Sequence, residues 1–326
     1  MADAARAAEA LGFDSAWFPD SQLLWRDAFV TMAVAALRTE RITLGTAVTN
    51  VATRHPSVLA SAARTVQELA PGRVILGVGT GNSAVHPVGL RASTRREMAA
   101  GVEVVRALQR GDAWTFGATK SGLRDPVGTC PVYIAATGPK NLAFAGQHGD
   151  GVMLLGGIAP TAIERSLTHV ARGIEAGGRD VADVEVVVAT FCQVTDDIER
   201  DARLLKPICA ALAQGGAQEH LAIAGIDLPD PGPIAGVYPD LIHAEDWPQA
   251  VEAAGRYVSD DDAIRFARSF CLFGTPDEIA ARIDAAAAVG VTSFYLQHVG
   301  SYDLPHTLME QFANTVLPRY AQSVGE

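Results

Sequence analysis

Residues 41–82 read RITLGTAVTNVATRHPSVLASAARTVQELAPGRVILGVGTGN, and this stretch decides the fold. It begins and ends with short runs rich in β-branched residues, 42–46 and 74–76, which favour strands. Between these runs, His55–Pro56 favours a helix start and Pro71–Gly72 a helix end. The stretch therefore predicts a strand–helix–strand unit with a polar, glycine-rich loop after each strand, which is where α/β folds build their ligand sites.

The same alternation of strands and helices extends over the rest of the chain. We expect further strands at residues 15–19, 132–135, 151–154, 185–192 and 293–296. We expect helices at residues 2–11, 27–38, 94–109, 140–147, 161–176, 196–213, 260–270 and, at the end, 304–323. Residues 111–129 predict a loop or short hairpin over the mouth of a barrel, and the proline-rich residues 215–246 predict an insertion rather than a domain boundary.

Apolar residues recur at helical spacing in the two helices nearest to the opening stretch. In residues 27–38 they are Val30, Ala33, Val34 and Leu37, and in the helix after Pro56 they are Val58, Ala62, Val66 and Leu69. Such a spacing favours a helix whose apolar face packs on a core. These faces are equally suited to packing on the sheet and to contact with a second copy of the chain.

Length and composition limit the class of protein. The chain has 326 residues, of which 48% are hydrophobic, so it can bury one large core, and we expect a single domain over residues 1–326. The net charge of −11 and the lack of a Lys/Arg run argue against nucleic-acid binding. The four cysteines form no CxxC pair, which favours reduced, buried thiols over a metal site. No signal peptide or membrane-spanning segment is recognisable, so we expect a cytoplasmic protein.

Four blocks of the sequence carry a resemblance to a known family. They are FDSAWFPDSQLLWRD at residues 13–27, the block from Gly45 to Ala84, PVYIAATGPKNLAFAGQHGDGVMLLGG at 131–157 and LFGTPDEIAARIDAAAAVGVTSFYLQHVG at 272–300. In this order they resemble the luciferase-like flavin/deazaflavin oxidoreductase superfamily, and within it the branch of F420-dependent methylenetetrahydromethanopterin reductase.

The resemblance implies an α/β fold, a (β/α)8 TIM barrel with insertions. In that fold a strand precedes the first helix, whereas here Met1 alone stands before residues 2–11. The first strand of the barrel is therefore expected to be missing from this chain. Either the start of the chain is truncated or misassigned, or another segment fills the gap. On the first interpretation the natural protein begins about 15–25 residues upstream, which is room for a strand and a short loop.

The resemblance also implies an activity. We expect an F420-dependent oxidoreductase that transfers a hydride between the deazaflavin and a small organic substrate. One alternative is an FMN-dependent monooxygenase of the same fold, which would need oxygen and a flavin reductase as partner. Another alternative is a relative that binds a flavin without catalysis. Because the family usually dimerises through barrel helices, we expect a homodimer, with no nucleic acid and no membrane as partner.

The resemblance places the cofactor ring at the ends of two neighbouring strands. The ring would lie on a bulge with a cis peptide bond between Ala47 and Val48, to which an ordinary trans strand end is the alternative. The glycine loop 77–81 lacks the third glycine of a dinucleotide fingerprint, and in a barrel it would let a flat ring approach the backbone. The cofactor-binding residues expected here are Thr46, Ala47, Val48, Thr49, Asn50, Gly79, Gly81 and Asn82.

The turn AATGPK at residues 135–140 is the candidate phosphate site. It joins a strand end to a helix amino terminus, whose free N–H groups and dipole favour an anion. A plain strand–helix turn gives the same pattern, but the resemblance places the cofactor phosphate there. The residues of this site are Ala135, Ala136, Thr137, Gly138 and Pro139, and Gly156 and Gly157 could close the same pocket.

Asp20 and Ser21 are the candidate catalytic residues. The resemblance places them where the family has an Asp-His or Asp-Ser pair beside the reactive edge of the ring, so they could bind the ring or relay a proton. Asp and Ser also cap helices, and a helix N-cap remains an equal alternative. The absence of the family's frequent histidine at Ser21 argues against a histidine-driven proton transfer. Arg54 and Thr53 either contact the cofactor or shape their loop, and His55 opens a helix rather than catalyses.

Overall fold

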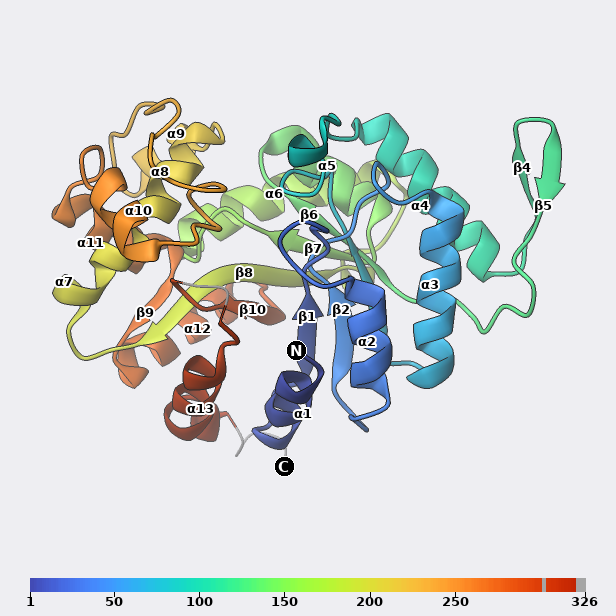
Figure 1. The fold of residues 1–326 in the computed structure, drawn as a ribbon, viewed down its shortest axis with the longest axis horizontal. Coiled ribbons are helices and arrows are strands. Elements are labelled where there is room, and N and C mark those ends of the chain that lie inside the picture. Colours follow the sequence, from blue (N-terminus) through green and yellow to red (C-terminus); the bar gives the residue numbers. More distant parts are fainter. Residues whose placement is uncertain (301–302, 321–326) are drawn as a thin grey trace. The chain divides into compact units, whose positions relative to one another are not determined.

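Parallel strands form the sheet of one unit of the computed structural model, residues 1–153 and 169–185 (Figure 1). The structure describes residues 1–300 and 303–320. The strands β1 (Ser15–Phe18), β2 (Thr43–Thr46), β3 (Val74–Val78) and β6 (Val132–Ala136) pair in this order with parallel register, and β7 (Gly151–Leu154) follows β6. Each of these strands lies at an apolar run from which it was expected.

Helices connect these strands, and their starts are set by capping residues. The helices are α1 (Ala2–Ala10), α2 (Ala28–Ala36), α3 (Pro56–Leu69), α4 (Arg95–Gln109), α5 (Pro139–His148) and the second half of α6 (Pro160–Ala176). The side chains of Asp27, His55 and Thr94 each accept a backbone N–H from the first turn of α2, α3 and α4. Caps of this kind satisfy N–H groups that the helix itself leaves free, which explains why the expected starts agree closely.

Glu9, at the end of α1, joins that helix to the turn before β2. Its carboxylate accepts the backbone N–H groups of Glu40, Arg41 and Ile42 at 2.6 to 3.1 Å. Three donors on one carboxylate hold its charged form, because hydrogen bonds to an ionised acceptor are stronger than neutral ones. α1 is therefore attached to the sheet by the hydrogen bonds of Glu9 as well as by its buried alanines.

Aromatic rings on the sheet lie over glycines of the neighbouring strand. A Cβ atom at Gly45 would lie 2.4 Å from the ring of Trp17, and one at Gly151 would lie 2.7 Å from the ring of Tyr133. The two rings themselves are 6.1 Å apart. Large side chains on one strand thus fill the space that glycine leaves on the next, which is how a parallel sheet packs its face without voids.

The core faces of α2 and α3 differ from those expected. The buried residues of α2 are Ala28, Phe29, Met32, Ala35 and Ala36, whereas Val30, Val34 and Leu37 are exposed. In α3 the core residues are Leu59, Ala60, Ala63, Val66 and Gln67. Of the residues expected there Val66 is buried, whereas Val58 and Leu69 are exposed. Both helices are apolar on more than one side, so spacing alone did not identify the buried face.

Residues 111–129 contain a hairpin, as expected. β4 (Trp114–Phe116) pairs antiparallel with β5 (Thr119–Ser121), and Figure 1 shows the hairpin at the edge of the unit, beyond α3 and α4. The ring of Phe116 lies 5.6 Å from that of His55 at the start of α3. The hairpin therefore packs on the outer helices, and the expectation that it covers a barrel mouth is wrong.

The other unit comprises residues 154–168 and 186–326. Its long strand β8 (Glu185–Val194) pairs in parallel with β10 (Ser293–Gln297) and with β9 (Leu272–Gly274). β9 was not expected, because a strand of three residues gives no periodic signal. Directly after it, Thr275 and Glu278 form a capping box at the start of α12. The helices are α7 (Ile198–Asp201), α8 (Lys206–Gln214), α9 (Gln218–Ile223), α10 (Trp247–Ala254), α11 (Asp260–Phe270), α12 (Pro276–Ala288) and α13 (His306–Thr315).

Two expectations for this unit need correction. The single helix expected at 196–213 is divided into α7, a 3-10 turn (Ala202–Leu205) and α8, which starts beside Pro207 because proline suits a first helical turn. The expected helix 304–323 is shorter, since α13 is followed by a 3-10 turn (Leu317–Arg319), and residues 321–323 of that expectation lie outside the described residues.

The four cysteines are buried, as expected from the sequence. Cys130, Cys192, Cys209 and Cys271 are all free thiols in buried positions, as expected. Burial raises the pKa of Cys209 to about 12, so this thiol stays protonated at neutral pH. In residues 1–300 and 303–320, no helix has both the length and the hydropathy needed to cross a bilayer.

Candidate functional site

The backbone after β2 forms the bulge on which the expected site depends. The peptide bond between Ala47 and Val48 is cis, as predicted. The amide of Ala47 donates to the carbonyl oxygen of Phe18 at 2.8 Å, so the bulge is bound to β1. On its other side the amide of Thr49 donates to Gly77 and the amide of Gly79 donates to Thr49, both at 2.8 Å. The bulge is thus held between the ends of β1 and β3.

Two glycines of the loop after β3 make room for this bulge. A Cβ atom at Gly77 would lie 2.0 Å from the carbonyl oxygen of Thr46, and one at Gly79 would lie 2.7 Å from a methyl group of Val48. A side chain at either position would displace the bulge, because real Cβ atoms do not approach neighbours so closely. The glycine-rich pattern is therefore explained first by the bulge itself.

Asn50 carries a buried hydrogen-bond donor that has no partner. Its side chain is 1% exposed, and its Oδ1 accepts the N–H groups of Ala52 and Thr53 at 3.0 and 2.8 Å. These two donors fix the orientation of the amide, so the other end must be Nδ2. Among the described residues, Nδ2 is buried without any hydrogen-bond partner. Because an unpaired buried donor costs about 1–3 kcal/mol, it marks a position where a ligand acceptor belongs.

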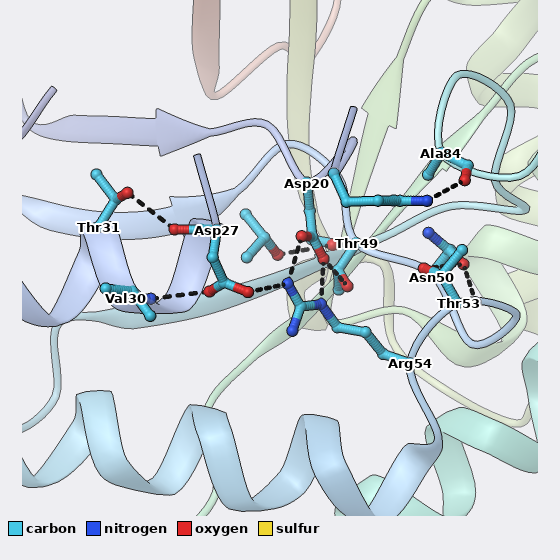
Figure 2. A network of polar contacts seen from close by, with 12 residues as sticks. Asp20, Asp27, Val30, Thr31, Thr49, Asn50, Thr53, Arg54 and Ala84 are labelled. Carbon is cyan, nitrogen blue, oxygen red and sulfur yellow. Dashed lines mark hydrogen bonds and ion pairs between the residues drawn. The ribbon is translucent and has the colours of Figure 1, made fainter. Parts of the chain in front are cut away.

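Asp20 is the centre of an ion-pair network (Figure 2). It is 4% exposed, and its two oxygens accept from Nη2 and Nε of Arg54, each at 2.7 Å. The hydroxyl of Thr49 donates to Oδ2 of Asp20 at 2.6 Å. Arg54 also donates to Asp27 at 2.7 Å, and Asp27 is the residue that caps α2. The alternative that Asp20 caps a helix is therefore wrong, and Arg54 shapes this loop by binding both carboxylates.

The electrostatics of the network favour its charged forms. The hydrogen bond to Asp20 raises the pKa of Arg54 above its usual value, although burial opposes this. Burial would raise the pKa of Asp27, but the hydrogen bond from Arg54 and the N–H of Val30 lower it below its usual value. Both oxygens of Asp20 accept from Arg54, so this side chain acts as a hydrogen-bond acceptor in the network.

Ser21 joins the loop after β1 to the loop after β3. Its side chain is 8% exposed, and its hydroxyl lies 2.7 Å from the hydroxyl of Ser83. A second bond runs parallel to it, because Nε2 of Gln22 donates to the carbonyl oxygen of Ala84 at 2.7 Å. In the same loop Gly81 adopts φ 83° beside Asn50, and the carbonyl oxygen of Asn82 accepts the amides of Val85 and His86. The ends of β1, β2 and β3 thus bring Asp20, Ser21, Asn50 and the glycine loop together.

The turn between β6 and α5 has the geometry of an anion site. β6 ends at Ala136, Thr137 is exposed, and Pro139 is the first residue of α5. Gly138 adopts φ 69°, a conformation that favours glycine, and a Cβ there would meet nothing within 4 Å. In the described part of the chain no side chain caps this helix, so the first N–H groups of α5 are available to an anion.

Gly156 and Gly157 belong to the other unit. A Cβ atom at Gly156 would lie 3.3 Å from the imidazole of His220, and one at Gly157 would lie 3.1 Å from the ring of Phe270. Both glycines thus lie close to side chains of that unit, and Gly157 also adopts φ 99°, which favours glycine. Their participation in the phosphate pocket stays a prediction.

Sequence reasoning missed two features of the site. The pairing of Arg54 with Asp20 links residues 34 positions apart, and nothing in the residue pattern indicates it. The contact between Ser21 and Ser83 spans 62 positions. The sequence held one signal for the contact between the serines. Both lie in loops that follow the carboxyl ends of strands in one parallel sheet, β1 and β3, and such loops converge.

Comparisons with known proteins agree with this architecture. Residues 1–293 match the model of the luciferase-like monooxygenase family. The chain is 31% identical over 301 residues to the 5,10-methylenetetrahydromethanopterin reductase of Methanolobus tindarius, with 90% of this chain and 88% of the relative covered. It is 29% identical over 346 residues to the F420-dependent glucose-6-phosphate dehydrogenase of Nakamurella multipartita, with 100% and 94% covered.

A solved structure supports the fold. The coenzyme F420-dependent tetrahydromethanopterin reductase of Methanopyrus kandleri superimposes with a TM-score of 0.76 at 23% identity, over 98% of this chain and 94% of that one. This likeness confirms the predicted fold class, the (β/α)8 TIM barrel of luciferase-like proteins. With the family model matching most of its length, the chain belongs to the luciferase-like monooxygenase family.

Proposed function

We propose that this protein is an F420-dependent oxidoreductase that transfers a hydride between the deazaflavin and a small organic substrate. The observation that carries the proposal is the buried, unpartnered amide nitrogen of Asn50 beside the cis bulge at Val48. The relatives support the choice of cofactor, because the curated relative from Nakamurella multipartita is named as F420-dependent.

The residues present fit a deazaflavin. Nδ2 of Asn50 would donate to an acceptor on the ring, and the side chain of Val48 would support one face of the ring beside the loop of Gly79 and Gly81. The uncapped start of α5 at Gly138 would hold the phosphate through backbone N–H groups. When bound, the deazaflavin supplies a two-electron hydride carrier, so the protein has to contribute binding, orientation and exclusion of water.

Asp20 and Ser21 take different roles in this proposal. Asp20 fixes Arg54 and Thr49 and thereby holds the loop after β1 against the bulge. Ser21 has a hydroxyl that can donate, so it is the residue of the pair that can bind a polar atom of the ring or of the substrate.

The second candidate is an FMN-dependent monooxygenase of the same fold, working with a flavin reductase. It is supported by the structural likeness to the monooxygenase RslO1 of Streptomyces bottropensis, whose TM-score is 0.67 at 21% identity. A flavin-binding relative without catalysis is the third candidate. F420 is preferred, because both curated relatives from the F420 branch are more similar in sequence than this monooxygenase.

The assembly is part of the same proposal. Val30 on α2 is 65% exposed, Leu37 directly after α2 is 71% exposed, and Val58 on α3 is also exposed. An apolar helix face of this kind is suited to a second copy of the chain. We propose a cytoplasmic homodimer in which residues 1–326 act as one functional domain, and light scattering that gives a monomer mass at micromolar concentration would contradict it.

The test of the cofactor is a calorimetric titration of the purified protein with F420 and with FMN. We expect F420 to bind more tightly than FMN. Sub-micromolar binding of FMN together with no binding of F420 would refute the proposal. Turnover with each cofactor then separates an oxidoreductase from a protein that binds without catalysis.

A further inference from the structure

The family resemblance indicates a role for Ser21 but none for Ser83, the residue to which the Ser21 hydroxyl is hydrogen-bonded. Ser21 lies on the loop after β1 and Ser83 on the loop after β3, and their Oγ atoms are 2.7 Å apart. Ser21 is 8% exposed, whereas Ser83 is half-buried. Ser21 is thus the more buried residue of the pair, and Ser83 is the one closer to solvent.

Asp20, the neighbour of Ser21, acts as a hydrogen-bond acceptor. Both oxygens of Asp20 accept from Arg54, and one of them also accepts from Thr49. A carboxylate paired in this way is an acceptor and not a donor. Of the two candidate residues Asp20 and Ser21, the one whose side chain can donate is accordingly Ser21.

The direction of the bond between the two hydroxyls decides what Ser21 can do. Each serine has one proton to donate, so a bond between them uses one of the two protons. If Ser83 donates to Ser21, the proton of Ser21 is free and its oxygen is held. A hydroxyl that accepts one hydrogen bond becomes a better donor in the next, by about 10–30% in condensed-phase estimates.

We propose that Ser83 is a positioning residue that donates to Ser21 and so directs the Ser21 hydroxyl toward an acceptor atom of the bound F420 ring. This inference rests on the proposed function. Ser83 acts through Ser21 and does not touch the ring. Its hydrogen bond holds the Ser21 oxygen and leaves the Ser21 proton to point away from Ser83, because a hydroxyl proton rotates to suit its partners.

A matched control exists in the same two loops. Gln22 donates to the carbonyl oxygen of Ala84 at 2.7 Å, so it connects the loops one residue further along each of them. Replacing Gln22 by methionine removes this connection and leaves the hydroxyl pair intact. A role in holding the loops together would thus be shared by Gln22 and Ser83, whereas a role in orienting Ser21 belongs to Ser83.

The experiment is a titration with oxidised F420, read as affinity and as the visible absorption spectrum of the bound deazaflavin. The proteins are wild type, Ser21→Ala, Ser83→Ala, Ser83→Thr, Gln22→Met and the double variant S21A/S83A. We expect Ser21→Ala to shift the spectrum of bound F420 and to weaken binding about fivefold, which is the loss of one hydrogen bond. Ser83→Ala should shift the spectrum in the same direction, and Ser83→Thr, which keeps the hydroxyl, should restore the wild-type spectrum.

The double variant and the control complete the test. We expect the double variant to equal Ser21→Ala, because Ser83 acts only through that hydroxyl, and we expect Gln22→Met to keep the wild-type spectrum. A wild-type spectrum in Ser83→Ala or in Ser21→Ala overturns the inference, and so does an equal shift in Gln22→Met. A wild-type protein that does not bind F420 at all overturns the proposed function and this inference with it.

Discussion

Arg54→Met should destabilise the protein strongly, because it leaves a buried carboxylate without its cation. The side chain of Asp20 is 4% exposed and that of Arg54 is 19% exposed. Methionine keeps much of the length and apolar contact of arginine but none of its donors. Asp20 would retain the 2.6 Å hydrogen bond from Thr49 and lose both bonds from Arg54. Removing one partner of a buried ion pair costs 3–5 kcal/mol, and since Arg54 is not fully buried we expect about 3 kcal/mol.

The assay is urea unfolding followed by circular dichroism. The free energies of unfolding are compared between variants whose unfolding depends on urea concentration with the same slope. Arg38→Met is the matched control, because the Arg38–Asp3 pair has 46% and 70% exposed side chains and should contribute less than about 1 kcal/mol. The double variant R54M/D20N should recover part of the loss, since it removes the unpaired charge. If Arg54→Met costs no more than Arg38→Met, Asp20 is not held as the structure indicates and the reasoning fails.

Three further predictions concern the phosphate turn, the bulge and the hydrogen bonds that Glu9 of α1 accepts. Gly138→Asp should weaken F420 binding at least tenfold, or about 1.4 kcal/mol, because it places a carboxylate at the proposed phosphate site. The control Gly178→Asp, at a glycine whose φ is also positive (63° against 69°), should leave the affinity for F420 unchanged. Gly77→Ala should lower stability to urea by about 2–3 kcal/mol through its 2.0 Å clash with a carbonyl oxygen, whereas Gly122→Ala, whose nearest atom is 3.6 Å away, should stay within about 0.5 kcal/mol. Burial alone would raise the pKa of Glu9, but the three backbone N–H donors lower this pKa below its usual value of 4.5. The ionised Glu9 therefore stabilises the folded protein fully above pH 4.5, and this contribution is lost as the pH falls through the lowered pKa. The melting temperature of Glu9→Gln should therefore lie below that of wild type at pH 7 and approach it in acid, and a constant difference would contradict this.

The elements of the fold could be predicted from sequence wherever a local cause fixed them. Strand ends coincide with apolar runs, and helix starts coincide with caps such as Asp27 and Thr94, because both effects act within a few residues. The buried face of α2 could not be predicted, since Val30 and Met32 are both apolar and the sheet decides between them. β9 was missed because a strand of three residues gives no periodic signal.

The site shows the same division. The bulge with its cis bond at Ala47–Val48 was expected from the resemblance, and the structure has it. The residues that hold it were not expected, because Arg54 is bound to partners far away in sequence and a charged residue in a loop is usually solvated. The unpaired nitrogen of Asn50 is visible only once the other end of the amide is seen to be engaged by the loop.

The hairpin at β4 and β5 has a consequence for engineering and for divergence. Its turn, Gly117 and Ala118, is exposed, and a Cβ atom at Gly117 would meet nothing within 4 Å. Exposed turns with small residues accept inserted sequence readily, since no buried contact or backbone hydrogen bond of the core is lost. A peptide tag or a fluorescent label can therefore be placed between these two residues without changing the strand ends that carry Asp20, Ser21 and Asn50. The same tolerance makes this turn a place where descendants of the chain can vary in length at little cost to folding.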